Sequence, residues 1–173
     1  MANKKNIVRR IKSAVISVSD KSNLKPLLQT LNRYNVKLIS SGGTFKAIRK
    51  LGYRCLEVSD YTGFNEILDG RVKTLHPKIH AGILNKRDNN SHKREIKKNN
   101  FQNIDLVIVN FYPFEKTLNT TKNHNKIIEK IDIGGPALVR SAAKNYNDVA
   151  VITSTNQYSA LIDQLKRFKG ATK

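Results

Sequence analysis

The chain has 173 residues, a length that forms one domain with a hydrophobic core of its own. Hydrophobic residues make up 39% and charged residues 26%, as in ordinary globular proteins, and no apolar run approaches the roughly 20 residues that cross a bilayer. The formal net charge is +19, from 32 lysines and arginines against 13 aspartates and glutamates, which attracts any anion but selects none.

The first third of the chain alternates strand and helix patterns. Residues 14–18 are a β-branched run that predicts a strand, and leucines at helical spacing predict a helix over residues 24–34. Residues 36–39 predict a second strand. The loop of residues 40–44 follows it and leads into a helix predicted over residues 45–51.

The middle of the chain is more mixed. Residues 54–58 predict a third strand, and residues 80–84 suggest another. Residues 88–100 are polar and predict an exposed helix or loop. The contiguous aliphatic run at residues 104–109 is the clearest strand, as expected when helices cover both faces of a sheet. Residues 117–125 read as a mobile connection.

The last third again alternates. Residues 136–144 predict a helix, and residues 149–152 repeat the buried strand pattern. An amphipathic helix is predicted over residues 158–168, capped near Ser154 or Thr155.

This alternation predicts an α/β fold, a doubly wound and mostly parallel sheet with helices on both faces. We expect the folded domain to span residues 11–168, between a disordered basic N-terminus at residues 1–10 and a disordered tail at residues 169–173. In such a sheet ligands bind beyond the carboxyl ends of the strands. The polar segments expected at that edge are residues 17–21, 40–44, 110–112 and the region around Asp132.

Two loops after strands could bind an anion. The loop of residues 40–44 places two hydroxyls and two glycines before a helix, where backbone N–H groups can face a phosphate. A tight turn with Thr44 as helix cap explains the same residues. Likewise Asp20 or Ser22 could simply cap a helix, with Lys21 in solvent. The shared sheet edge is what favours the binding interpretation.

The segment of residues 70–77 is harder to explain structurally. Arg71 offers a bidentate guanidinium and Lys73 a point charge, which suits a phosphate or a developing oxyanion. The alternative is a solvated basic turn made rigid by Pro77, and we favour the functional interpretation. His76 and His80 lie four residues apart, but no third ligand stands near them, so we predict no metal.

Polar side chains also follow the central strand and precede the helix of residues 136–144. Asn110 can offer an amide and Tyr112 a phenol, although a tyrosine in a proline-bounded turn is commonly a core residue. Asp132 could be only a helix cap, and Lys144 stands near a helix end where the dipole favours a cation. Each of these structural explanations accounts for its own residue. A chain without a binding site would require all of them to be correct together.

Cysteine and aromatic content exclude several classes of protein. Cys55 is the single cysteine, which rules out an internal disulfide framework and fits a cytoplasmic location. The polar N-terminus lacks the apolar stretch of a secretory signal. Aromatic residues make up 7%, which leaves few platforms for stacking bases, so we expect neither a specific nucleic-acid partner nor a membrane partner.

Taken together, five segments resemble the inosinate (IMP) cyclohydrolase domain of the bifunctional purine-biosynthesis enzyme: residues 17–21, 41–44, 71–77, 110–114 and 132–145. The likeness runs from about Lys12 to the end of the last helix. It implies a methylglyoxal-synthase-like fold, a homodimer, no cofactor and no metal. The implied reaction closes formamido-imidazole-carboxamide ribotide (FAICAR) to inosine monophosphate (IMP) with loss of water. Full-length relatives continue into a formyltransferase domain that uses a folate donor, and these 173 residues do not contain it.

The resemblance also implies residue roles. Residues that would bind the nucleotide are Ser19, Asp20, Lys21, Ser41, Gly42, Gly43, Thr44, Arg71, Val72, Thr74, Val109, Asn110 and Ile133, and those around the reacting centre are Lys73, Tyr112, Asp132 and Lys144. In this hypothesis Lys73 steadies the oxyanion, and Lys144 moves protons with help from Asp132 and Tyr112. Arg71 and the loop of residues 41–44 would grip the 5′-phosphate.

One distance conflicts with this assignment. A continuous helix over residues 136–144 would separate Asp132 from Lys144 by about 12 Å or more. Either Lys144 folds back, or the ligand spans the helix, or a partner subunit supplies one group.

Three rival functions stay open. A regulatory module would bind a phosphorylated effector without turnover, and methylglyoxal synthase relies on carboxylates where this chain has lysines. A nucleic-acid-binding protein would depend on the +19 charge alone.

Overall fold

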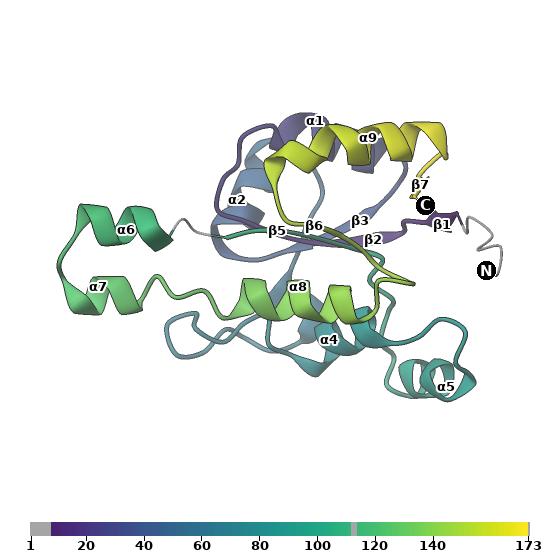
Figure 1. Cartoon of the computed structure of the whole chain (residues 1–173). Coiled ribbons are helices and arrows are strands. Elements are labelled where there is room, and N and C mark those ends of the chain that lie inside the picture. Colours follow the sequence, from purple (N-terminus) through teal and green to yellow (C-terminus); the bar gives the residue numbers. More distant parts are fainter. Residues whose placement is uncertain (1–7, 112–113, 173) are drawn as a thin grey trace, which may run out of the picture.

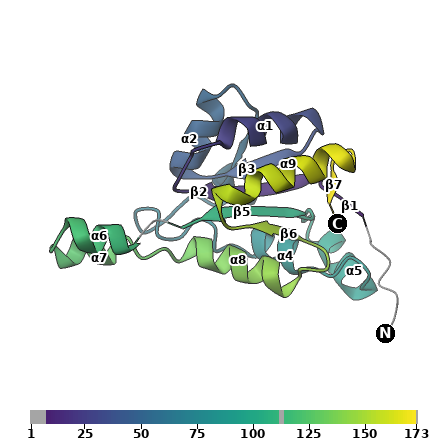
Figure 2. The same ribbon diagram turned by 45° about the horizontal axis from the view of Figure 1, so that its top comes forward.

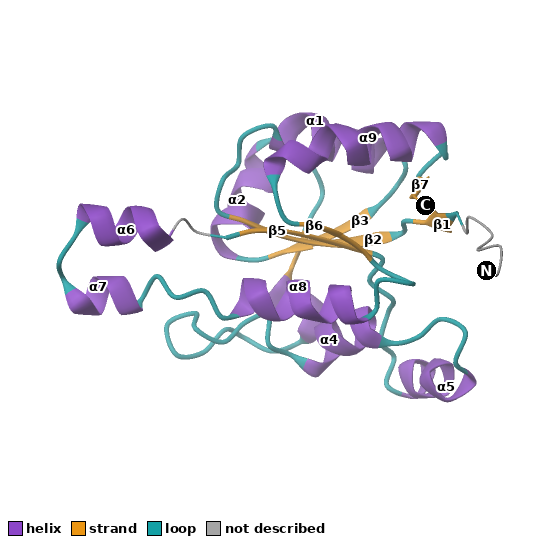
Figure 3. Cartoon of the chain, viewed as in Figure 1, coloured by secondary structure: helices purple, strands orange, loops and turns teal. Residues whose placement is uncertain are grey.

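The computed structural model describes residues 8–111 and 114–172, and its centre is a parallel sheet of five strands (Figures 1 and 3). The strands lie in the order β4-β3-β2-β5-β6, and each neighbouring pair is parallel. Their bounds are Ser13–Val18 (β2), Lys37–Ser40 (β3), Leu56–Glu57 (β4), Leu106–Asn110 (β5) and Ala150–Ile152 (β6).

Helices cover both faces of this sheet, so the predicted doubly wound α/β fold is confirmed (Figure 2). One face packs against α1 (Leu24–Arg33), α2 (Gly42–Lys50) and α9 (Tyr158–Arg167). The other packs against α3 (Val58–Thr62), α4 (Pro77–Leu84) and α8 (Gly134–Lys144). Successive residues of β5 are buried on alternate sides, Leu106 and Ile108 in one core and Val107 and Val109 in the other.

The remaining helices lie outside the two layers. They are α5 (Asn90–Lys98), α6 (Phe114–Thr120), α7 (His124–Ile128) and the 3₁₀ helix η1 (Thr155–Gln157). Helices α6 and α7 form a projecting arm beyond the carboxyl end of β5, on the left of Figure 1. We call these two helices the arm. The segment predicted to be a mobile connection is therefore partly helical.

The strand predicted at residues 80–84 is wrong, because that segment belongs to helix α4. Pro77 occupies the first turn, and the His76 side chain accepts a hydrogen bond from the Lys78 amide as the N-cap. Ile79 and Ile83, one helical turn apart, are both fully buried. A short apolar run cannot be assigned to helix or strand by periodicity alone.

The two ends of the described chain pair with each other, so the disorder expected at residues 9–10 of the N-terminus and at residues 171–172 of the tail is wrong. Strand β1 (Arg9–Arg10) is antiparallel to β7 (Ala171–Thr172). Ala171 is buried, and the Ile11 amide donates to the Gly170 carbonyl at 2.9 Å. Residues 1–7 and Lys173 of the predicted termini lie outside the described residues. Within the described part, no helix is long and apolar enough to cross a membrane.

Candidate active site

A pocket of about 560 Å³ opens at the carboxyl edge of the sheet, where the fold class predicts a ligand. Eight of the predicted residues line it: Ser19, Ser41, Arg71, Lys73, Thr74, Asn110, Asp132 and Ile133. They come from the ends of β2, β3 and β5 and from the segments that lead into α4 and α8. Five segments remote in sequence therefore meet in one cavity.

Asn110 at the end of β5 holds the loop that follows β2. Its Oδ1 accepts hydrogen bonds from the Ser19 amide at 2.7 Å and the Asp20 amide at 2.8 Å. Its Nδ2 donates to the Asp20 carbonyl at 2.9 Å. The amide predicted to serve a ligand thus already fixes the backbone of this rim, with all three bonds made inside the protein.

The glycine-rich loop is the first turn of α2, so the predicted loop and the predicted Thr44 cap are both wrong. Gly42 has φ of 54°, a left-handed conformation that glycine adopts without strain. The buried Thr44 hydroxyl accepts from the Val18 amide and donates to the Val18 carbonyl, both at 3.0 Å. This pair of bonds ties the start of α2 to the end of β2, and Ser41 at the N-cap faces the pocket.

Lys73 lies between two glycines at the pocket wall. A Cβ placed on Gly42 or on Gly70 would stand 3.5 Å from Lys73 Nζ, so the ammonium packs closely against both turns. Its nearest carboxylate oxygen is Glu66 Oε2 at 3.9 Å, and the lysine side chain is 37% exposed. The ammonium is therefore positioned by backbone but still open to a ligand.

Arg71 is paired with a carboxylate that sequence reasoning missed. Glu129, which follows α7 of the arm, accepts hydrogen bonds from Arg71 Nη2 and from Arg71 Nε, the latter at 3.4 Å. The bond from Arg71 holds the pKa of Glu129 below its usual range, and the same contact raises the pKa of Arg71. Both side chains are exposed and line the pocket, so a ligand phosphate must compete with Glu129 for this guanidinium.

Asp132 stands at the start of α8, where Oδ1 accepts from the Gly135 amide at 2.9 Å. The N-cap position belongs to Ile133, so Asp132 bonds the first turn of α8 from one residue before the cap, and its carboxylate still borders the pocket. A Cβ on Gly135 would lie 2.4 Å from Asp132 Oδ2, and a Cβ on Gly134 would lie 2.4 Å from Thr74 Oγ1. Both glycines are required for the close approach of α8 to these side chains.

The other predicted binding residues do not line the cavity, although several support it: Asp20, Lys21, Gly42, Gly43, Thr44, Val72 and Val109. Asp20 Oδ1 accepts from the Ser22 amide at 2.8 Å and the Ser22 hydroxyl at 2.6 Å, and these bonds lower its pKa. Helix α1 begins only at Leu24, so Asp20 does not cap it. Tyr112 lies outside the described residues.

Lys144 is not brought to this pocket. Helix α8 runs unbroken from Gly134 to Lys144, so its two ends lie about 15 Å apart at 1.5 Å per residue. Lys144 lines a different cleft, beside residues such as Asn145 and Asp148 at the amino edge of the sheet. The idea that Lys144 folds back is therefore wrong, and a role for it at the pocket needs a long ligand or a second copy.

Sequence reasoning also missed several pocket residues. Besides Glu129, these include Asp69, Gly70, Ile128, Ile131 and the glycine pair 134–135. The glycines stood in the motif and were open to detection, whereas Glu129 lies between the predicted connection of residues 117–125 and the motif that begins at Asp132, where no role was predicted. Among the described residues, no group of three histidine, cysteine or acidic side chains could hold a metal.

Comparison with known proteins assigns the class. The model of the MGS-like domain family matches residues 23–137, and the chain belongs to this family. Its structure is similar to the crystal structure of ForH, with a TM-score of 0.81 and 33% sequence identity, over 92% of this chain and 82% of that one.

Curated relatives make the assignment more specific. The chain is 49% identical over 164 residues to the bifunctional purine biosynthesis protein PurH of Bradyrhizobium diazoefficiens, which covers 95% of this chain. It is 53% identical over 158 residues to PurH of Prochlorococcus marinus, which covers 90% of this chain. The predicted resemblance to the bifunctional purine-biosynthesis enzyme is confirmed. The chain spans 31% and 30% of the lengths of these two relatives.

Proposed function

We propose that this chain is an IMP cyclohydrolase that closes FAICAR to IMP with loss of water. The observation that carries the proposal is the meeting of Lys73, Asn110 and Asp132 in one pocket, in a chain that belongs with the PurH proteins. Scattering of these three side chains over opposite surfaces would have excluded a shared site.

The reaction asks three things of the pocket. The carboxamide nitrogen must attack the formyl carbon, so a C–N bond forms and the formyl oxygen becomes an oxyanion. This oxygen then leaves as water, with one proton from the carboxamide nitrogen and one from the formamido nitrogen. The site must therefore align two groups, hold negative charge and move protons.

Lys73 and Asp132 suit the last two tasks. The Lys73 ammonium, fixed against Gly42 and Gly70, can stabilise the oxyanion. Asp132, held by the Gly135 amide, can accept and return a proton across the pocket. Tyr112, two residues after Asn110 and outside the described residues, keeps its predicted assisting role in this proposal.

The phosphate would bind in the same pocket, beside the start of α2. Ser41, the N-cap of α2, lines the pocket, and the helix N-terminus behind it would favour an anion there. Arg71 would join them after the phosphate displaces Glu129. The pocket contains no resident metal in this proposal, and no cofactor is required.

The experiment is an absorbance assay of purine ring formation from the formylated ribotide. We expect the chain to turn over, and we expect Lys73→Ala to lose on the order of 100-fold or more, the usual effect of removing an oxyanion donor. Lys50→Ala, at the exposed end of α2, is the matched control and should stay near the parent rate. Nucleotide binding without turnover would support the regulatory alternative instead.

The role of Lys144 as proton carrier has its own test. A loss of less than about tenfold in Lys144→Ala would remove it from proton transfer, whose usual contribution is larger. A larger loss would require either a ligand that spans α8 or a second copy that brings its lysine to the pocket, the latter in agreement with the predicted homodimer. We also propose that the formyltransferase activity of longer relatives resides outside these residues.

A further inference from the structure

A second and larger cleft lies at the opposite edge of the sheet, where the strands begin. It has a volume of about 1110 Å³, against about 560 Å³ for the carboxyl-edge pocket. We call it the amino-edge cleft. Its lining side chains are Arg9, Arg10, Lys12, Ser13, Lys37, Lys86, Arg87, Asp88, Gln102, Asn103, Asp105, Lys144, Asn145, Asn147 and Asp148.

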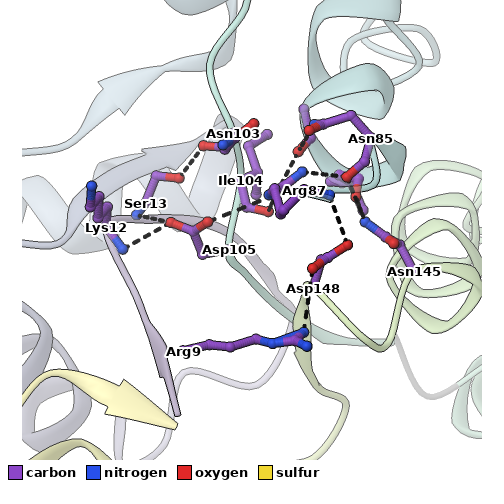
Figure 4. A network of polar contacts seen from close by, with 12 residues as sticks. Arg9, Lys12, Ser13, Asn85, Arg87, Asn103, Ile104, Asp105, Asn145 and Asp148 are labelled. Carbon is purple, nitrogen blue, oxygen red and sulfur yellow. Dashed lines mark hydrogen bonds and ion pairs between the residues drawn. The ribbon is translucent and has the colours of Figure 1, made fainter. Parts of the chain in front are cut away.

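A network of polar contacts builds one wall of this cleft (Figure 4). Arg87 donates from Nη1 to the Asn85 carbonyl at 2.6 Å and from Nη2 to the carbonyls of Gly82 and Ile104 at 3.1 and 2.9 Å. Asn145 Nδ2 donates to the carbonyls of Ile83 and Asn85 at 2.8 and 2.9 Å. These bonds join the ends of α4 and α8 to the start of β5, so the wall is preorganised.

Two of the three carboxylates in the cleft are already committed to this network. Asp105 Oδ2 accepts from the amides of Lys12 and Ser13 at 2.9 and 3.2 Å, and Oδ1 lies 3.8 Å from Arg87 Nη2. Asp148 accepts from the Arg87 amide at 3.0 Å and pairs with Arg9 at 3.5 Å. Their negative charge is therefore offset inside the protein.

Most of the cations have no such partner. In the described part of the chain, Arg10, Lys12, Lys86 and Lys144 form no ion pair, and all four are exposed. Against these four charges stands only Asp88, an exposed carboxylate that also makes no ion pair among the described residues. The cleft therefore carries a net positive charge, because Asp105 and Asp148 already interact with Arg87 and Arg9.

The lining also indicates what kind of anion fits. Among the described residues that line it there is no aromatic and no aliphatic side chain, so none of them would stack on a base as an aromatic ring does or bury an apolar group. Lysines and arginines act on phosphate oxygens by charge and hydrogen bonding, and several neighbouring cations suit a ligand with several adjacent negative groups.

We propose that the amino-edge cleft is a second anion site that takes an oligophosphate chain, free or carried by a nucleoside triphosphate. This site is separate from the carboxyl-edge pocket, because the two cavities share no lining residue and lie at opposite ends of the strands. It accounts for part of the excess positive charge that the cyclohydrolase proposal leaves unexplained.

The test is calorimetric titration of the whole chain with tripolyphosphate and, separately, with ATP and AMP. We expect saturable binding of one tripolyphosphate per chain. Lys12→Gln/Lys86→Gln should weaken it by about tenfold, whereas the charge-matched Lys25→Gln/Lys166→Gln on α1 and α9 should change it less than about twofold. All four lysine side chains are exposed, so both double variants should fold, as thermal unfolding would verify.

The ligand series distinguishes the sources of the phosphate chain. Equal affinity for ATP and tripolyphosphate, with weaker AMP binding, supports recognition of the chain alone. Tighter ATP binding with the same loss in Lys12→Gln/Lys86→Gln supports a nucleotide as the source. Arg71→Gln should leave tripolyphosphate binding intact, because Arg71 belongs to the other pocket.

Four results would overturn the proposal. They are equal weakening by both double variants, loss of binding in Arg71→Gln, affinity for single-stranded DNA that rises with its length and ignores the variants, and absence of saturable binding. None of these outcomes depends on whether the chain closes FAICAR, so the two proposals fail separately.

Discussion

At the scale of single residues, the start of α8 requires glycine, because a side chain there would collide with groups at the pocket. Gly135 faces both Asp132 and Val109, whose Cγ1 atom would lie 3.1 Å from an added Cβ. The Asp132 carboxylate would be only 2.4 Å away from the same Cβ. A methyl group at this position must push the carboxylate into the pocket or move the helix.

We therefore expect Gly135→Ala to reduce ring closure by more than about tenfold and to lower the free energy of unfolding by about 1–3 kcal/mol, the usual range for overpacking. Urea unfolding and the absorbance assay measure the two effects. Gly43→Ala is the stability control, because an added Cβ there meets nothing within 4 Å. Equal stability of the two variants would contradict the steric explanation.

Sequence could predict the residue roles that depend on residue type and spacing. It could not predict those that depend on tertiary packing. Motifs identified Lys73 and Asp132, which line one pocket, because residue type and spacing survive without coordinates. They could not show that Glu129 occupies Arg71 or that Lys144 faces another cleft, since both facts depend on where distant elements pack. An assignment carried over by resemblance contains no distances.

At the scale of elements, the rim of the pocket depends on one side chain. The Asn110 side chain makes three hydrogen bonds to the backbone of residues 19–20 in the loop after β2, beside one longer backbone bond from the Ser19 amide to the Asn110 carbonyl at 3.4 Å. Asn110→Ala should cost about 1–3 kcal/mol through the backbone groups left unpaired. Hydrogen exchange at the Ser19 and Asp20 amides should rise more than at the Ile16 amide in β2. Unchanged protection would contradict the positioning role.

Helices α4 and α8 meet at a histidine whose protonation opposes folding. His80 Nδ1 lies 2.9 Å from Ser141 Oγ, and burial lowers the pKa of His80, with partial compensation from the Thr74 carbonyl. Because the folded pKa lies below the ordinary value of 6.5, the stabilisation is complete above that value and is lost as pH falls toward the folded pKa.

Urea unfolding at pH 7.5 and at pH 5 should therefore show a drop in stability at the lower pH. His80→Gln should reduce this drop, because glutamine keeps a polar group near Ser141 without a titrating proton. An identical pH dependence in the variant would assign the effect to other groups.

The prediction of helices and strands succeeded where the sequence pattern was unambiguous. It failed where tertiary packing determines the secondary structure. The contiguous aliphatic run of β5 and the amphipathic α9 were predicted within two residues of their observed bounds. Helix α4 was missed because Ile79 and Ile83 owe their helical phase to contacts with α8 and the sheet, which no local window contains. The predicted helix began at residue 45, three residues after the observed start of α2, because glycine has a low helix propensity. The hydrogen bonds between Thr44 and Val18 stabilise this start, and they are tertiary contacts that sequence does not show.

At the scale of the whole molecule, the two edges of the sheet differ in how their charged side chains are held. The carboxyl edge exposes a pocket whose cations are held by glycine turns and by a displaceable carboxylate. The amino edge is fastened by Arg87, which joins the end of α4 to the start of β5 through three carbonyls and one carboxylate. Burial lowers the pKa of this guanidinium and its neighbouring aspartates oppose the shift.

Arg87→Ala should lower the free energy of unfolding by about 2–4 kcal/mol, because it leaves backbone carbonyls without their donor and the Asp105 carboxylate without its ion-pair partner. Arg94→Ala on the exposed helix α5 should change it by less than about 0.5 kcal/mol. Urea denaturation of both variants provides the comparison. A loss in Arg87→Ala no larger than in Arg94→Ala would show that the network contributes little to folding.

The pairing of β1 with β7 places the ends of the described chain next to each other, on the side of the sheet away from the pocket. A short linker from Thr172 to Arg9 could therefore close the polypeptide into a ring without disturbing either core. New termini opened between α6 and α7 would then lie in the arm itself. Such a circular permutant would separate the contribution of an intact arm from that of the catalytic groups, since the order of the residues changes while their positions do not.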